Sequence, residues 1–425
     1  MPDLPMARGV RDLLPNAALF MNEALDKIER VFQRFGFLTI DTPAIESLKV
    51  LKAKGGIGEE AKLIFELKDD ELGLRYDQTV SLARYMVMHQ ELPLPFKRYA
   101  IGKAWRREEP QHLRYRELTQ ADVDIVGGDS MAADAEVIAT AAAALEELGF
   151  EYNIRVSSRK VMDGVLASFG VKSEMAAGVM RAIDKLDKLG LDGVIEALLG
   201  MGIDRDVASR IDKLLGMQGS NEEKLGYLSS VVQDKKAVEE LGAVLDTLKA
   251  YNLRGNVNVD LSVVRGLDYY TGIVFEYMDA SGAVKASLGG GGRYDNLIAL
   301  YGGRSLPAVG VALGVDRIMD LLGYESSIKY TNAKLFMINV KESNYRYSIE
   351  TANWFRSRGV ATDVNLAARN ISNQLAYANS LKFGYAAIVG DVEEKAGKVK
   401  LRNLASGEEI MLTREEAFDI LVRGA

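Results

Sequence analysis

Apolar residues recur at two different spacings along the chain, and these spacings predict where helices and strands lie. In residues 16–35 the apolar positions lie three or four residues apart, which predicts an amphipathic helix. A strand is predicted over 37–40, a hairpin over 63–76, and two longer strands over 96–105 and 117–126. Because these strands follow one another without intervening helices, we expect an antiparallel sheet.

The pattern changes twice more towards the C-terminus. Residues 171–250 are rich in Ala, Leu, Lys, Asp and Glu at helical spacing, which predicts a helical insertion. Strand-like, glycine-rich sequence returns over 256–304, and a helix is predicted over 311–322. From there strands and helices alternate, which predicts a compact α/β domain. We therefore expect an α+β fold with domains at 1–330, which includes the insertion, and 331–425.

The composition excludes several kinds of chemistry. The 425 residues include no cysteine, so disulfides, thiolate zinc sites and cysteine nucleophiles are ruled out. His89 and His112 are the two histidines, too few for a His-rich metal site. The net charge of −7 argues mildly against a nucleic-acid partner. With neither a leader-like N-terminus nor a membrane-length apolar run, we expect a cytoplasmic protein that does not bind membranes.

Two segments carry residues suited to binding a polar ligand. Residues 96–116 hold seven basic residues against two glutamates, between two predicted strands. Guanidinium groups in such a loop clamp polyphosphates through paired donors, although a salt-bridged, solvated hairpin has the same composition. Later, Arg265 precedes Asp268, Tyr269 and Tyr270. This segment suits either the wall of a small-molecule pocket or an internal Arg–Asp pair beside two packed tyrosines.

Three shorter segments add further candidates. Asp77 and Thr79 share one face where a strand ends, so they suit either an ammonium ligand or the cap of the helix that follows. The glycines at 289–292 permit close backbone approach or a tight turn, and they fit neither nucleotide-binding glycine motif. Arg317 is expected one turn into the helix at 311–322, either meeting a phosphate or lying at the surface.

Seven segments follow one another in a characteristic order. They are RGVRDLLP at 8–15, FGF to Pro43 from 35, WRRE at 105–108, RYR at 114–116, RGLDYY at 265–270, GGRYD at 291–295 and GVALGVDR at 310–317. This order resembles the histidyl-tRNA synthetase family of class II aminoacyl-tRNA synthetases, over essentially the whole chain. The second segment is similar to class II motif 1, which implies a homodimer. The last domain is similar to an anticodon-binding domain.

The resemblance implies that the cationic loop binds ATP. Arg106 would hold the α-phosphate, Arg114 the outer phosphates and Arg317 the γ-phosphate end. Glu108 would contact adenine or its ribose. Mg²⁺ would accompany ATP, with no dedicated metal ligands in the chain.

The resemblance also implies a set of histidine-binding residues. The set is Asp77, Gln78, Thr79, Gln120, Asp124, Arg265, Tyr269, Tyr270 and Tyr294. Asp77 and Thr79 would bind the α-ammonium group, and Gln120 would lie by the carboxylate. Asp124 and Tyr270 would hold the two imidazole nitrogens, while Tyr269 and Tyr294 shape the pocket. Arg265, the second catalytic residue beside Arg106, would stabilise charge on the α-phosphate.

The implied activity is that of a histidine–tRNA ligase. ATP would activate L-histidine to histidyl-adenylate, and the histidyl group would pass to the terminal adenosine of tRNA(His). One alternative is a catalytically inactive paralogue that serves as a regulatory subunit in histidine biosynthesis, and another is a synthetase for a different amino acid. The two signatures at 265–270 and 291–295 favour the histidine enzyme. The insertion either touches the acceptor arm of tRNA or only caps the sheet.

The chain departs from the family pattern at a few positions. Asp77 and Asp124 stand where glutamate is usual, and each is one methylene shorter. Leu113 and Leu118 replace a usual glycine and phenylalanine, and Glu109 replaces a commonly basic residue. The carboxylates keep their charge, so these departures affect the geometry of the site rather than its chemistry.

Overall fold

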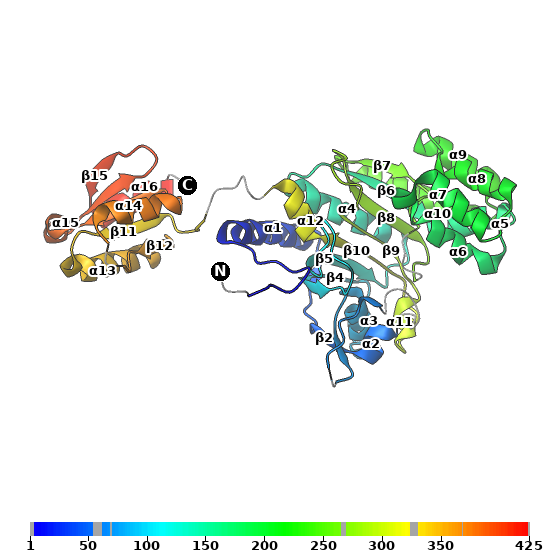
Figure 1. The fold of residues 1–425 in the computed structure, drawn as a ribbon, viewed down its shortest axis with the longest axis horizontal. Coiled ribbons are helices and arrows are strands. Elements are labelled where there is room, and N and C mark those ends of the chain that lie inside the picture. The colour runs from blue at the N-terminus through cyan, green and yellow to red at the C-terminus, as the bar shows by residue number, and fades with distance from the viewer. Residues whose placement is uncertain are drawn as a thin grey trace. The chain divides into compact units, whose positions relative to one another are not determined.

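The computed structural model divides into two compact units, each described by itself (Figure 1). Unit 1 comprises residues 1–11 and 24–322, and unit 2 comprises residues 12–23 and 323–425. The structure describes residues 4–53, 62–68, 70–264, 269–323, 330–367 and 369–423. Arg265 and Asp268, both singled out above, lie outside these residues.

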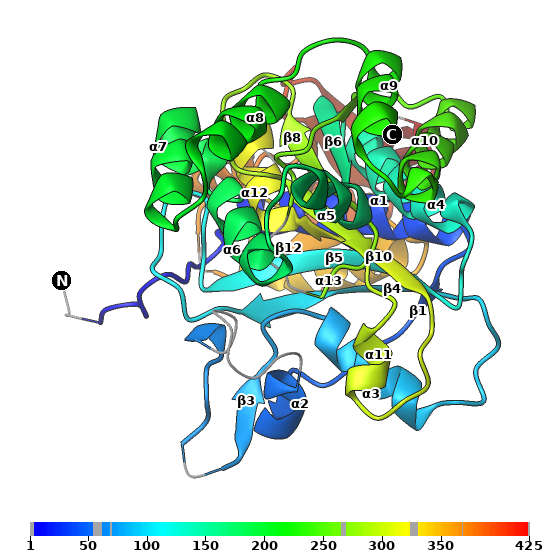
Figure 2. The same ribbon diagram turned by 90° about the vertical axis from the view of Figure 1, so that its right-hand side faces the viewer.

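Unit 1 is built on an eight-stranded sheet. In spatial order its strands are β1 (Leu38–Thr39), β4 (Phe96–Trp105), β5 (Glu117–Val126), β10 (Ala308–Gly314), β9 (Gly289–Arg293), β8 (Ile273–Asp279), β6 (Tyr152–Ser158) and β7 (Asn256–Val259). The pairs β1–β4 and β6–β7 are parallel, and the other neighbours are antiparallel. Figure 2 shows β4, β5 and β10 lying side by side. The expected α+β fold with a largely antiparallel sheet is confirmed.

The glycine run at 289–292 belongs to a central strand, so its interpretation as a tight turn is wrong. These glycines begin β9, which pairs with β8 and β10. A Cβ atom on Gly291 would lie 1.9 Å from the carbonyl oxygen of Gly310, so only glycine fits this close pairing. Gly289 and Gly290 also border the cavity described below, as close backbone approach to a ligand requires.

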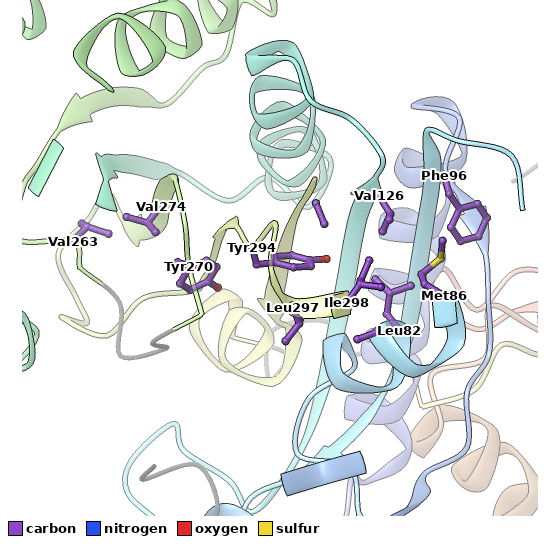
Figure 3. Packing of buried hydrophobic residues seen from close by; sticks show 12 residues of the cluster. Leu82, Met86, Phe96, Val126, Val263, Tyr270, Val274, Tyr294, Leu297 and Ile298 are labelled. Carbon is purple, nitrogen blue, oxygen red and sulfur yellow. The ribbon is translucent and has the colours of Figure 1, made fainter. Parts of the chain in front are cut away.

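Helices pack against this sheet and enclose its core. The helices outside the insertion are α1 (Pro15–Arg34), of which residues 24–34 belong to unit 1, α2 (Leu48–Lys52), α3 (Thr79–Met88), α4 (Met131–Glu147), α5 (Arg159–Ser168), α11 (Leu297–Leu300) and α12 (Val315–Leu322). One core cluster joins α3, α11 and the sheet, and Figure 3 shows Leu82, Leu297, Tyr270 and Tyr294 within it. Two of the residues that the sequence places at the ligand, Tyr270 and Tyr294, are thus also part of the hydrophobic core.

Residues 171–250 form a group of helices that gathers at one end of unit 1 (Figure 1). They are α6 (Ser173–Ile183), α7 (Leu186–Gly200), α8 (Arg205–Leu215), α9 (Asn221–Val231) and α10 (Lys235–Ala250). Polar side chains cap several N-termini, including a capping box in which Ser220 and Glu223 bond each other's backbone. The apolar faces of these helices close over one another, with Val194, Leu198 and Ile211 fully buried.

Unit 2 is a five-stranded sheet covered on both faces. Its strand order is β12 (Thr362–Val364), β11 (Leu335–Asn339), β13 (Tyr385–Val389), β14 (Val399–Asn403) and β15 (Glu409–Leu412). Its helices are η3 (Glu342–Asn344), α13 (Tyr345–Arg356), α14 (Ile371–Ser380), α15 (Asp391–Ala396) and α16 (Arg414–Arg423). Two separate apolar clusters form because β11 and β13 are buried on both faces. The expected alternation of strands and helices is confirmed.

One predicted helix differs from the structure, and a predicted hairpin is present. The helix expected over 311–322 begins at Val315, because Ala308–Gly314 is instead a strand buried between β5 and β9. An apolar run cannot by its periodicity distinguish a buried strand from a buried helix. The two arms of the hairpin expected over 63–76 do pair, because Glu66 forms an antiparallel bridge with Gly73 and the backbone N–H groups of Leu67 and Leu74 donate to the carbonyl oxygens of Leu72 and Phe65. Its second arm contains β3 (Leu72–Leu74), which also pairs with β2 (Ile45–Ser47). None of the described helices is long and apolar enough to cross a membrane.

Candidate active site

A cavity of about 730 Å³ opens beside β5 in unit 1 and collects most of the predicted site residues. Those that border it are Asp77, Thr79, Arg106, Glu108, Arg114, Gln120, Asp124, Tyr269, Tyr270, Tyr294 and Arg317. Gln78 is buried behind this wall, where its amide donates to the carbonyl oxygens of Ala100 and Gln120. It therefore supports the wall and does not face the ligand space.

Three arginines lie together at one end of the cavity. Burial lowers the pKa of Arg317, and the positive charges of Arg114 and Arg106 add to that effect, while Glu108 opposes it. Arg114 Nη1 lies 3.2 Å from Glu108 Oε2, and Arg106 Nε donates to the carbonyl oxygen of Tyr76 at 3.1 Å. Three guanidinium groups with one carboxylate leave an excess of positive charge, which suits a polyphosphate.

The backbone holds Arg317 towards this cluster. Its guanidinium donates to the carbonyl oxygens of Ser287 and Leu113. Leu113 adopts a φ of +60°, a left-handed conformation that favours glycine. The departure from the family's usual glycine therefore places a strained residue within the loop that contacts Arg317.

A network of ion pairs and hydrogen bonds, not predicted from the sequence, ties the N-terminal segment to α12. Arg11 donates to Asp320 at 2.6 Å, to Asp316 at 3.0 Å and to the hydroxyl of Tyr115 at 2.7 Å. Burial alone would lower the pKa of Arg11, but Asp320 and Asp316 raise it. Burial, together with the hydrogen bond to Asp320, raises the pKa of Tyr115 to about 12. The network fixes α12, and hence Arg317, against the loop after β4.

The opposite side of the cavity is acidic. Gln120, Asp122 and Asp124 alternate along β5 and all border the cavity, as Asp77 does. Asp77 Oδ1 accepts the backbone N–H of Val80 at 2.9 Å, so the expected helix cap is present at the start of α3. Asp122 was not among the predicted residues, although the alternation of polar residues in an apolar strand could have identified it.

Asp124 forms a buried ion pair that the sequence did not reveal. Arg98 Nη2 lies 2.6 Å from Asp124 Oδ2, and the Arg98 side chain is fully buried. Tyr294 donates its hydroxyl hydrogen to Asp124 Oδ1. Burial raises the pKa of Tyr294 well above its usual value, and the charge of Asp124 adds to this. The sequence counted Arg98 among the basic residues of 96–116, but its pairing was not foreseen because only the register of β4 on β5 brings it opposite Asp124.

Stacked tyrosines form the remaining wall. The ring centroids of Tyr269 and Tyr270 lie 4.5 Å apart, and the rings of Tyr269 and Tyr294 form a T-shaped pair with centroids 5.9 Å apart. Asp184 from the helical insertion and Glu276 from β8 also border the cavity. No local pattern marked either of these two, since Asp184 depends on how the insertion packs and Glu276 on the register of β8 in the sheet.

The cavity thus joins a cationic end to an acidic end across a largely antiparallel sheet. A polyphosphate fits the first end, and a small ligand with N–H donors fits the second. This arrangement matches the class II aminoacyl-tRNA synthetase motifs seen in the sequence.

Comparison with known proteins narrows this class to one family. The family profile of histidyl-tRNA synthetase matches residues 9–318, and that of an anticodon binding domain matches residues 334–423. The chain is 40% identical over 405 residues to a histidine–tRNA ligase of Korarchaeum cryptofilum, with 93% of each chain covered. The chain belongs to the histidyl-tRNA synthetase family.

Two solved structures are similar over nearly the whole chain. The histidyl-tRNA synthetase of a Nostoc species superposes with a TM-score of 0.88 at 27% identity, covering 100% of both chains. A protein of Bacillus halodurans described as an ATP phosphoribosyltransferase regulatory subunit/histidyl-tRNA synthetase gives 0.77 at 23% identity, covering 91% of this chain and 99% of that one. The second likeness shows the fold alone.

Proposed function

We propose that the chain is a histidine–tRNA ligase that activates L-histidine with ATP and transfers it to tRNA(His). The observation that carries this proposal is the cavity with a cationic and an acidic end, in a chain 40% identical to a histidine–tRNA ligase. One end suits the triphosphate of ATP, and the other suits an amino acid with two ring nitrogens.

We assign ATP to the arginine end. Arg106 would hold the α-phosphate, with Arg114 and Arg317 on the outer phosphates and Glu108 near adenine or its ribose. The mutual effect of the three arginines on the pKa of Arg317 supports this, because anionic phosphate relieves the repulsion. Arg265 is assigned to the charge that develops at the α-phosphate, on the family resemblance alone.

We assign the amino acid to the acidic end. Asp77 and Thr79 would take the α-ammonium group, and Gln120 would lie near the carboxylate. That carboxylate attacks the α-phosphorus, its bond to phosphorus forms as the bond to pyrophosphate breaks, and histidyl-adenylate results. No protein nucleophile takes part, so the enzyme acts through positioning and electrostatics.

We propose that Mg²⁺ enters with ATP. Among the described residues, no three His, Cys, Asp or Glu side chains gather as a metal site. Mg²⁺ commonly binds substrate phosphates rather than a cage built only of protein ligands, so it would be held mainly by ATP. The bound ion would neutralise charge on the phosphates.

We further propose that unit 2 binds tRNA and that the enzyme is a cytoplasmic homodimer. The match of residues 334–423 to an anticodon binding domain supports the first point. For the second, β1 is an edge strand, and the side chains of Leu38 and nearby Ile45 are 60% and 49% exposed, as at an unpartnered interface. Light scattering at two protein concentrations tests the dimer.

Histidine-dependent ATP–pyrophosphate exchange tests the proposed activity. A ligase incorporates labelled pyrophosphate into ATP with L-histidine and not with the other nineteen amino acids. Charging of a tRNA(His) transcript then tests the second step. An absence of exchange in the folded chain would reject the proposal and favour a regulatory paralogue, whereas exchange with another amino acid would reject histidine as the substrate.

A further inference from the structure

A buried cation, Arg293, joins several segments of unit 1 behind the tyrosines of the cavity. It is 2% exposed, and its partner Asp134 on α4 is fully buried. Arg293 Nε donates to Asp134 Oδ1 at 3.1 Å, and Nη2 donates to Asp134 Oδ2. Nη1 donates to the carbonyl oxygen of Gly128 at 3.0 Å, and Nη2 to that of Ser130 at 3.4 Å. A buried cation satisfied in this way favours one arrangement, because any other leaves polar groups without partners.

The same arginine restrains the chain on both sides of Tyr294. Arg293 Nη1 also donates to Asp295 Oδ1 at 3.3 Å, and that oxygen accepts the backbone N–H of Ala308 at 3.0 Å. Between the two charged residues, the backbone N–H of Tyr294 donates to the carbonyl oxygen of Ala308 at 2.7 Å. The backbone that carries the Tyr294 ring is therefore held before and after it.

Thr271 links this restrained segment to the other two tyrosines. Its backbone N–H donates to the carbonyl oxygen of Arg293 at 2.8 Å, and its hydroxyl oxygen accepts the backbone N–H of Asp295 at 3.1 Å. Thr271 directly follows Tyr270, whose ring centroid lies 4.5 Å from that of Tyr269. The segment with these two tyrosines is therefore attached to the end of β9 through the backbone and the hydroxyl group of one residue.

The packing of the three rings makes their positions depend on each other. Tyr270 and Tyr294 are 7% and 2% exposed and belong to one core cluster (Figure 3). The T-shaped pair of Tyr269 and Tyr294 connects the two segments from the cavity side. Because protein interiors are close-packed, a backbone shift at Thr271 moves these rings and is not absorbed by free space. A displacement of about 1 Å in a site is enough to lower catalysis about 100-fold.

We infer that Thr271 is a positioning residue that sets the tyrosine wall at the acidic end of the cavity. It holds the segment of Tyr270 in place against that of Tyr294, with Arg293 as the buried anchor. Thr271 is not among the residues that border the cavity, so it acts through the tyrosines and not by touching the ligand. The inference rests on the proposed function, since that function assigns the amino acid to this end.

The test measures KM for histidine and for ATP in pyrophosphate exchange. Thr271→Val keeps the shape of the side chain but removes the acceptor of the Asp295 N–H. We expect KM for histidine to rise about 3- to 10-fold, the effect of one lost hydrogen bond. KM for ATP should stay constant, because ATP is assigned to the opposite end of the cavity. Thr271→Ser keeps the hydroxyl group and should retain the wild-type KM for histidine.

Thr140→Val is the matched control. The hydroxyl group of Thr140 donates to the carbonyl oxygen of Glu136 within α4, at a position that does not border the cavity. The same chemical change is therefore expected to leave both KM values at the wild-type level.

Arg293→Lys tests the buried anchor. Lysine keeps the positive charge beside Asp134 but lacks the planar fork that also reaches Gly128 and Asp295. KM for histidine should rise, as in Thr271→Val. Combining the two changes should raise it by less than the product of the single effects, because both act on the same wall. If Arg293→Lys does not fold, the two Thr271 variants decide the question.

The inference is overturned if Thr271→Val leaves KM for histidine unchanged, raises both KM values equally or lowers only kcat. A purely structural defect has the last effect, because it reduces the amount of active enzyme and not its affinity. Equal defects in Thr271→Ser and Thr271→Val would also overturn it, since the hydroxyl group would then have no role. A folded wild-type chain without histidine-dependent exchange would reject the proposed function, which is a different result. Circular dichroism establishes that each variant folds.

Discussion

Replacing Asp122 by asparagine should stabilise unit 1. The wild-type carboxylate is 1% exposed, and neither oxygen has a hydrogen-bond partner among the described residues. An unsatisfied buried group costs about 1–3 kcal/mol and a charged one more, and the amide of asparagine keeps part of that cost. We therefore expect a net gain of about 1–2 kcal/mol in the free energy of unfolding.

Asp124→Asn should have the opposite effect on stability. It removes the negative charge that lies 2.6 Å from the fully buried Arg98. Breaking a buried ion pair from one side costs about 3–5 kcal/mol, because the remaining charge has no partner. Two isosteric changes, two residues apart on the same strand, are thus predicted to move stability in opposite directions.

The gain from Asp122→Asn should also depend on pH. Burial raises the pKa of Asp122 in the folded state, so the folded chain binds this proton more tightly than the unfolded chain. Below the unfolded-state pKa of about 3.9 the carboxyl is neutral in both states and imposes no penalty. As the pH rises from there to the folded-state pKa, the wild type loses stability relative to the variant, and above that pKa the difference is constant.

Tryptophan fluorescence provides the assay. The chain has two tryptophans, Trp105 in unit 1 and Trp354 in unit 2, so a Trp354→Phe background reports on unit 1. Urea unfolding of the wild type, Asp122→Asn and Asp124→Asn in this background is measured from pH 5 to pH 8. If Asp122→Asn is no more stable at pH 8, or if its advantage does not grow with pH, the reasoning about the unpaired carboxylate is refuted.

Three further substitutions test the cavity wall. Gly310→Ala places a Cβ atom 1.8 Å from Asp124 Oδ1, so we expect the free energy of unfolding of unit 1 in urea to fall by about 3 kcal/mol. Gly314→Ala is the control and should cost less, because its Cβ atom would lie no closer than 3.3 Å to another residue. Equal losses would contradict the steric argument. Leu113→Gly removes the strain of a φ of +60° but gives the unfolded chain more conformational freedom. Because these effects oppose each other, the free energy of unfolding should stay within about 1 kcal/mol of the wild type. A larger loss would mean that packing of the leucine side chain stabilises the loop. Arg11→Met releases α12 from its ion pairs and should raise KM for ATP while KM for histidine stays constant. An unchanged KM for ATP would show that the network does not position Arg317.

Much of the fold could be predicted because its signals are local. The strands Phe96–Trp105 and Glu117–Val126 match their predicted bounds. Proline and glycine residues flank these segments and mark where each strand ends. The predicted start of the helix over 311–322 was wrong, because an apolar run such as 308–314 is compatible with either a buried strand or a buried helix. Its choice of strand depends on β5 and β9, which are distant in sequence.

The residues of the candidate site were likewise predicted only in part. Motif order identified Arg106, Arg114 and Arg317, and the cavity brings them together. The burial of Asp122 and the ion pair of Arg98 were not predicted, because neither residue stands out from its neighbours in the sequence. Their importance arises from burial and from which partner each one has.

The sequence by itself determined the kinds of elements, their order and the family, because helical and strand periodicity and short motifs are properties of neighbouring residues. Only the tertiary structure decided which carboxylate has a partner. The register of β4 on β5 sets Arg98 opposite Asp124 and Ala100 opposite Asp122. Asp124 therefore forms a direct ion pair with the buried cation, whereas Asp122 lies between two alanines at the wall of the cavity. That distinction depends on pairing between residues more than twenty positions apart, which no local pattern encodes.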